Sequence, residues 1–182
     1  AAHLLHLHGI GRLDIAGGAP DVLATLTGIS SGGSWSDTGT ILFARQTVGP
    51  LWRVAALGGE PVPVTELDPP RQISHRQPHF LPDGRQFLFL AEGVPEAAGL
   101  YLGSLEGGVP RRLTATDSGG AFVPPDRVVF VRQGALVARR LDLALGALTG
   151  DPETLADGVG WERYGRGGFA VSGSGLVAYR AG

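Results

Sequence analysis

The stretch FLPDGRQFLFL, residues 80–90, joins a tight-turn signal to a dense apolar run. Asp83 can accept hydrogen bonds from nearby backbone amides, and Gly84 can adopt the positive φ that tight turns require. The run FLFL places apolar side chains on both faces of a strand, which is typical of a strand covered on both sides. We therefore expect a hairpin turn at Asp83-Gly84 that leads into a buried strand.

Weaker copies of this pattern recur at a spacing of about 45 residues, the period of propeller blades. Each copy has an aromatic residue, a turn of Asp, Gly, Pro or Ser, and then four apolar residues: WSDTGTILFA at 35–44, FVPPDRVVFV at 122–131 and FAVSGSGLVAYR at 169–180. Phe43, Phe89, Phe130 and Ala178 occupy matching places in these copies.

A second pattern, in which a glycine-containing turn joins two strands, alternates with the first. It occurs as GRLDIAGGAPDVL at 11–23, LWRVAALGGEPVPVT at 51–65, LYLGSLEGGVPRRLT at 100–114 and LVARRLDLALGALTG at 136–150. One copy of each pattern supplies four antiparallel strands, which make one propeller blade.

The sequence therefore predicts an all-β protein, a β-propeller that is either partial or built from about four blades of four antiparallel strands. The chain, 1–182, is expected to form a single propeller domain or fragment with blade parts at 11–28, 34–68, 78–115, 120–157 and 168–182. Strands are expected near 12–16, 40–44, 51–56, 86–90, 100–105, 128–131, 136–141 and 175–180. The predicted core residues are Phe43, Leu88, Phe89 and Val129.

Composition narrows the class of partner. The 182 residues carry a formal net charge of -2, and the charges are scattered along the chain. Because the sequence shows no basic face, a nucleic-acid partner is not expected. No apolar run approaches the roughly 18–20 residues of a membrane helix, so no span is expected in this chain. Cys is absent, which excludes disulfides and thiol chemistry.

The chain opens with the outer half of a blade and closes with the inner half. We therefore expect an open arc, cut from a longer protein, whose open blade edges favour self-association.

These repeats resemble the WD40-like, TolB-type (PD40) β-propeller repeats. More narrowly, the span 11–182 is similar to the C-terminal propeller region of bacterial membrane-anchored serine/threonine protein kinases, on the stretches RLDIAGGAP, GGSWSDTGTILFA, LWRVAALGGEPVPVT, SHRQPHFLPDGRQFLFL, FVRQGALVARRLD and FAVSGSGLVAYRAG. The resemblance implies a non-catalytic, extracytoplasmic sensor domain that binds a protein or small ligand. Two alternatives stay open: an accessory propeller of a prolyl-oligopeptidase-type hydrolase, and a TolB-like periplasmic scaffold.

Two arginine-containing stretches are candidate ligand-face loops. RQISHRQPHF, 71–80, is expected to be a loop at the end of the central channel, where it could hold an anion or a peptide carboxylate; the alternative is a structural role, favoured for His79. GWERYGRGGF, 160–169, alternates aromatic residues with arginines around glycines that can expose backbone amides to an anion, or it is a flexible connection. The candidate residues are Arg71, His75, Arg76, Trp161, Arg163, Tyr164 and Arg166.

Catalytic, metal and cofactor sites are not expected. His3, His6 and His8 form an H-x2-H-x-H cluster, but Asp14 is the nearest carboxylate and the cluster lacks a cysteine. GISSG, 28–32, fits the G-x-S-x-G spacing with Ser30 in the nucleophile place. A nucleophile elbow needs a helix after the serine, whereas GSWSDTGT is rich in turn residues.

Overall fold

A computed structural model describes residues 9–28 and 30–182 of the chain. The described residues form strands and one short 3-10 helix, η1 (Arg163–Gly165). Three four-stranded antiparallel sheets follow one another along the chain, in the orders β3-β4-β5-β6, β7-β8-β9-β10 and β11-β12-β13-β14. The expectation of an all-β propeller fold with four-stranded antiparallel units is confirmed. No helix in the described part of the chain is long and apolar enough to cross a membrane.

Each complete sheet is built from four strands that are consecutive in the chain. The first sheet contains β3 (Gly33–Trp35), β4 (Thr40–Ala44), β5 (Leu51–Ala55) and β6 (Val62–Pro63). The second contains β7 (Gln72–Phe80), β8 (Gln86–Gly93), β9 (Gly99–Ser104) and β10 (Arg111–Thr114). The third contains β11 (Ala121–Val123), β12 (Arg127–Arg132), β13 (Ala135–Asp142) and β14 (Ala147–Ala156).

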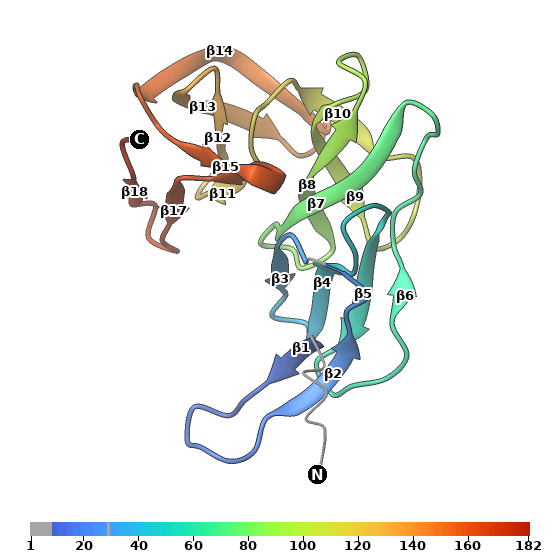
Figure 1. Cartoon of the computed structure of the whole chain (residues 1–182). Coiled ribbons are helices and arrows are strands. Elements are labelled where there is room, and N and C mark those ends of the chain that lie inside the picture. Colours follow the sequence, from blue (N-terminus) through green and yellow to red (C-terminus); the bar gives the residue numbers. More distant parts are fainter. Residues whose placement is uncertain (1–8, 29) are drawn as a thin grey trace.

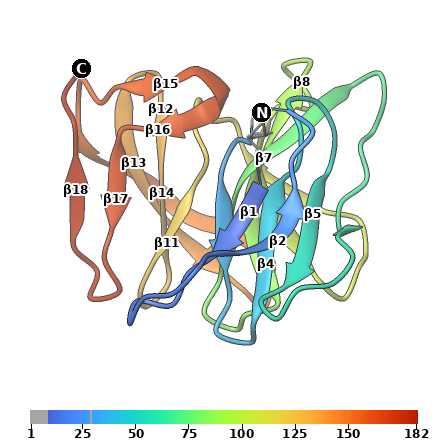
Figure 2. The ribbon, with the colours of Figure 1, turned by 60° about the horizontal axis from the view of Figure 1, so that its bottom comes forward.

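Two-stranded hairpins stand at the two ends of this series. β1 (Gly9–Arg12) pairs with β2 (Asp21–Thr25), and β17 (Phe169–Val171) pairs with β18 (Val177–Tyr179). A small ribbon, β15 (Trp161–Glu162) with β16 (Arg166–Gly167), flanks η1 before β17. The sheets follow a curve with the two hairpins apart at its ends (Figures 1 and 2), and the described strands of the hairpins do not pair with each other. The arc is therefore open.

The turn at Asp83-Gly84 has the predicted chemistry. The backbone amides of Arg85 and Gln86 each donate to Asp83 Oδ1 over 2.9 Å. Gly84 has φ 65, a left-handed conformation that glycine adopts without the steric penalty of a Cβ. The turn joins β7 to β8, which is fully buried from Phe87 to Ala91.

The core lies between neighbouring sheets because each apolar sheet face is covered by the next sheet. Leu88 packs with residues of β9 and β12, whereas Phe89 packs on the other face with residues of β4 and β5. The Phe89 and Tyr101 rings stack with their centroids 5.5 Å apart. The predicted core residues Phe43, Leu88, Phe89 and Val129 are at most 1% exposed, which confirms them.

Two local expectations are wrong. The first strand is Gly9–Arg12 rather than 12–16, because Asp14 closes a turn: its Oδ1 accepts from the Ala16 amide over 2.8 Å and its carbonyl accepts from the Gly17 amide over 2.9 Å. The stretch 71–80 is not a loop, because Gln72–Phe80 is strand β7. Its first half pairs with β8 and also bridges to Gly49, whose carbonyl accepts from the His75 amide over 2.8 Å.

Candidate functional site: a concave groove

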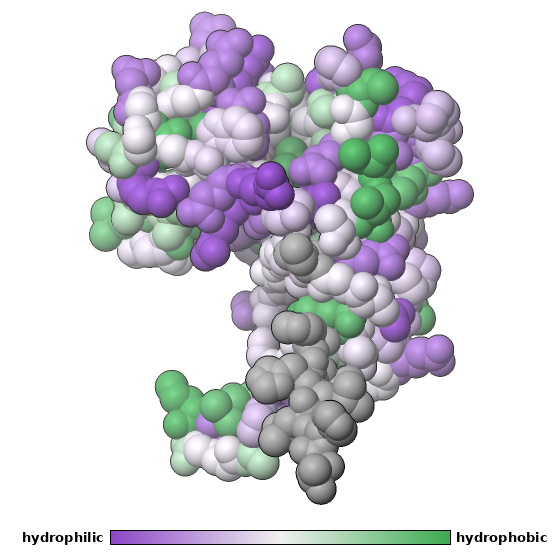
Figure 3. Space-filling model, viewed as in Figure 1, coloured by the Kyte–Doolittle hydropathy of each residue, from purple (hydrophilic) through white to green (hydrophobic). Residues whose placement is uncertain are grey.

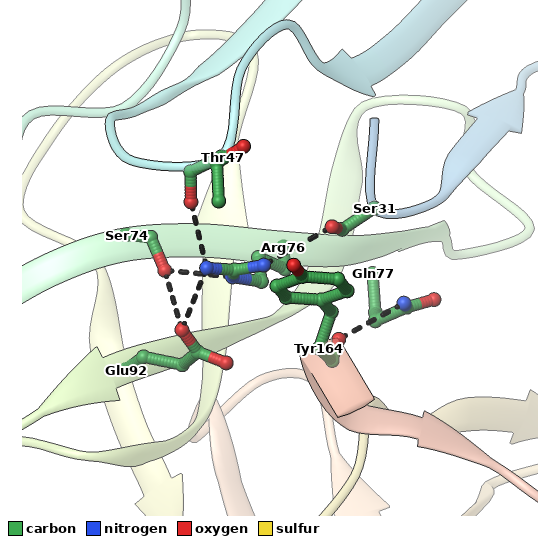
Figure 4. A network of polar contacts seen from close by, with 7 residues as sticks. All are labelled: Ser31, Thr47, Ser74, Arg76, Gln77, Glu92 and Tyr164. Atoms are coloured by element: carbon green, nitrogen blue, oxygen red, sulfur yellow. Dashed lines mark hydrogen bonds and ion pairs between the residues drawn. The ribbon is translucent and has the colours of Figure 1, made fainter. Parts of the chain in front are cut away.

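Arg76 on β7 connects its own sheet to other segments of the chain through hydrogen bonds and an ion pair. Its Nε donates to Ser74 Oγ over 2.8 Å, Nη1 to Ser31 Oγ over 3.1 Å, and Nη2 to the Thr47 carbonyl over 2.6 Å. Glu92 Oε2 lies 2.9 Å from Nη2 and balances the charge (Figure 4). With 4% of its side chain exposed and each guanidinium nitrogen engaged, Arg76 is occupied by its own protein rather than displayed to a ligand.

The same arginine fixes η1, although about 90 residues separate them in the chain. The Arg76 guanidinium lies 4.6 Å from the centre of the Tyr164 ring, a cation–π contact. Gln77 Nε2 donates to the Tyr164 carbonyl over 3.1 Å, and the Gly119 amide donates to the Gly165 carbonyl over 2.8 Å. Tyr164 holds φ 70, an uncommon conformation for a bulky residue, so its contacts must stabilise it. Figure 4 shows η1 seated beside β7 in this arrangement.

Three neighbouring cavities form what we call the concave groove. The largest has a volume of about 550 Å³ and is lined by Ser30, Ser31, Gly32, Gly33, Gln77, Glu162, Arg163, Tyr164 and Arg166.

The other two cavities continue from the first along the inner strands. One of about 230 Å³ shares Gln77 and Arg166 with the largest cavity and extends to His79. The next, of about 290 Å³, begins at His79 and reaches Trp35 and Asp37 near the hairpin turns. Because successive cavities share these residues, the groove follows the second half of β7, 77–80, on the inner side of the arc.

The two cavities at the η1 end have mainly polar linings, and glycine backbone lies close to Gln77 there. A Cβ on Gly32 would lie 2.7 Å from Gln77 Oε1, and one on Gly119 would lie 2.5 Å from Gln77 Cβ. Such distances leave no room for side chains, so glycine lets the backbone approach Gln77 closely. Gln77 itself has φ 49 and marks the irregular point of β7, where the register with β8 shifts.

His75 lies outside the groove. Its Nε2 is 3.1 Å from Gln72 Oε1, which can only accept, so Nδ1 accepts from the Thr65 hydroxyl over 2.8 Å. Burial lowers the pKa of His75 to about 4. The ring faces a separate cavity of about 290 Å³ that is lined also by Gln72, Phe89 and Tyr101. The expectation that His75 faces the channel end is wrong, because the strand turns its side chain toward the neighbouring sheet.

The remaining candidate residues divide between the groove and the surface. Arg163, Tyr164 and Arg166 come together at the largest cavity. Arg71 forms an exposed ion pair with Asp68 over 2.9 Å, and Trp161 is 54% exposed in β15 without lining any of the three groove cavities.

Sequence reasoning missed the groove residues Gln77 and Gly32, because a strand irregularity carries no local sequence signal. Ser30 also lines the groove, but the chain after it enters strand β3 rather than a helix, so the structural context of a nucleophile elbow is missing. His79 lies on the inner half of β7, where burial lowers its pKa. The cluster His3, His6 and His8 lies outside the described residues.

Comparison with known proteins supports the fold. No protein-family profile matches the chain, and no curated protein sequence matches it. Among solved structures, TolB from Acinetobacter baumannii superposes with a TM-score of 0.64 at 17% identity, over 93% of this chain and 42% of that one. The nidogen/laminin complex gives a TM-score of 0.63 at 13% identity, over 83% of this chain and 59% of that one.

An enzyme structure is also similar. Puromycin hydrolase gives a TM-score of 0.61 at 16% identity, over 93% of this chain and 34% of that chain. The chain thus spans less than two thirds of the length of each of these proteins. At such identities the likeness concerns the fold, which is a β-propeller of the kind found in TolB.

Proposed function

We propose that the chain is a non-catalytic binding module whose concave groove receives a protein or peptide partner. The observation that carries this proposal is the meeting of Arg163, Tyr164 and Arg166 with Gln77 around one cavity of about 550 Å³. Loops held on a rigid scaffold are the usual place of binding sites. Here the contacts of Tyr164 with β7 hold the arginine-bearing segment in place before a partner arrives.

The biological setting proposed is the extracytoplasmic part of a bacterial serine/threonine kinase-like receptor. The support is the resemblance of the repeats to the propeller region of such kinases, together with the TolB-like fold. A second candidate is the accessory propeller of a prolyl-oligopeptidase-type hydrolase, which the similarity to puromycin hydrolase favours. A TolB-like periplasmic scaffold is the third.

Selection from a displayed library of random peptides tests the binding role. We expect enriched peptides to bind the chain and to lose affinity when Arg163→Gln and Arg166→Gln are combined. The matched control combines Arg53→Gln and Arg132→Gln, which make the same charge change on strands β5 and β12. Peptides that bind both double variants equally well, or no enrichment at all, contradict the proposal.

The gene on either side of this segment decides between the settings. A kinase domain and a membrane helix encoded upstream support the receptor, whereas an α/β-hydrolase domain encoded downstream supports the accessory propeller. Neither flank being present leaves the scaffold as the better explanation.

A further inference from the structure

We propose that the η1 end of the groove recognises acidic side chains of an extended peptide. This inference rests on the proposed binding function and adds the chemistry of the ligand. It begins from the arginines, which supply all fifteen of the chain's basic Lys and Arg side chains.

Most arginines have partners within the described residues. Seven form ion pairs with carboxylates, Arg45 lies over Trp52, and others donate to backbone carbonyls. Within the described part of the chain, the arginines with none of these partners are Arg53, Arg132, Arg163 and Arg166. Of these, only Arg163 and Arg166 line the groove, and they line the same cavity.

The positive charge of this cavity is not cancelled by its own lining. Glu162 is the one carboxylate among the lining residues described, and its Oε1 lies 3.1 Å from Arg180 Nη2. Glu162 is thus already compensated by an arginine outside the cavity. Figure 3 shows hydrophilic side chains gathered over β15 and η1. A ligand that brings carboxylates satisfies both guanidinium groups, since Arg and carboxylate form charge-assisted hydrogen bonds.

The shape of the groove favours a peptide over a compact anion. Cavities of about 550, 230 and 290 Å³ follow one another along the second half of β7 and the neighbouring inner strands, which suits an extended chain. The far end differs in charge, because Asp37 lines it and the half-buried His79 has a lowered pKa that favours its neutral form. Acidic residues are therefore attracted to the η1 end and repelled from the Asp37 end.

Fluorescence anisotropy with two labelled peptides tests the inference: Glu-Gly-Glu-Gly-Glu-Gly and its counterpart with Gln in place of Glu. We expect the acidic peptide to bind at least about 10-fold more tightly, which corresponds to about 1.4 kcal/mol. Combining Arg163→Gln with Arg166→Gln removes that preference, whereas combining Arg53→Gln with Arg132→Gln keeps it. The thermal midpoints of both variants should match the parent, because the side chains are exposed.

Each contrary outcome has a distinct meaning. Equal binding of the two peptides, or equal losses in the two double variants, overturns the acidic preference. If library-selected neutral peptides still need Arg163 and Arg166, the proposed binding function stands but the acidic preference does not. Displacement of the acidic peptide by inorganic phosphate at equal concentration assigns the cavity to a free anion and overturns the peptide assignment.

Discussion

Strand β8 in the second sheet and strand β18 in the terminal hairpin carry related sequence patterns in opposite surroundings. Phe89 of β8 is 0% exposed, whereas Ala178, in the matching place of β18, is exposed. Leu176 and Tyr179 beside it are 72% and 54% exposed. The turn chemistry recurs too, since Gly84 and Gly175 both have positive φ.

The difference shows what a blade requires from its neighbours. β8 has sheets packed on both faces, through Leu88 on one side and Phe89 on the other. The β17–β18 hairpin packs through Phe169, Val171 and Val177 against the third sheet alone. The repeat therefore specifies local hairpins, and burial depends on how many sheets stand beside each one.

The largest expected effect belongs to Phe89. Replacing Phe89 with Ala should lower the free energy of unfolding by roughly 3–5 kcal/mol, because it leaves a cavity among packed rings. Urea unfolding followed by circular dichroism measures the change. A loss below about 1 kcal/mol would show that the second sheet is no better packed than the hairpin.

Acid should weaken the second sheet through His75. Its pKa falls from 6.5 to about 4 on folding, so the unfolded chain takes up the proton first. Stability is therefore complete above pH 6.5 and declines as the pH falls to about 4, by about 3 kcal/mol in all. Urea midpoints at several pH values measure this, and His75→Gln should flatten the decline. An unchanged acid profile in that variant would contradict the assignment.

The two turn glycines allow a matched test. Gly84→Ala should cost roughly 1–2 kcal/mol, because a Cβ is disfavoured in the left-handed region and would lie 3.2 Å from Thr38 Cγ2. Gly175→Ala meets nothing closer than 3.7 Å, and its hairpin can open without unfolding the sheets. Thermal unfolding should show the larger shift for Gly84→Ala; the reverse order would mean that the hairpin is part of the cooperative unit.

The smallest effect is expected at Tyr179. Because this side chain is 54% exposed, Tyr179→Ala should change the free energy of unfolding by no more than about 0.5 kcal/mol. The same urea titration measures it. A loss as large as that of Phe89→Ala would reveal that the face of β18 is covered in solution, and light scattering would then identify a second copy as the cover.

Much of the fold follows from local patterns in the sequence. The alternation of apolar runs with Asp, Gly and Pro turns predicts the strands of the sheets, and Asp83-Gly84 behaves as its chemistry requires. The first strand is misplaced because Asp14 closes a turn that the apolar pattern of 12–16 conceals. The loop assigned to 71–80 is wrong because pairing with Gly49 depends on a residue outside the stretch.

The sequence by itself determined the all-β repeat, its turns and the arginine-rich stretch at 160–169, because each depends on residues close together in the chain. Only the tertiary structure decided that Arg76 is buried and bonded within the protein, while Arg163 and Arg166 line the groove. The physical reason is that the partners of Arg76, from Ser31 to Tyr164, come from distant parts of the chain. Long-range packing selects which arginine is neutralised and which is left for a ligand.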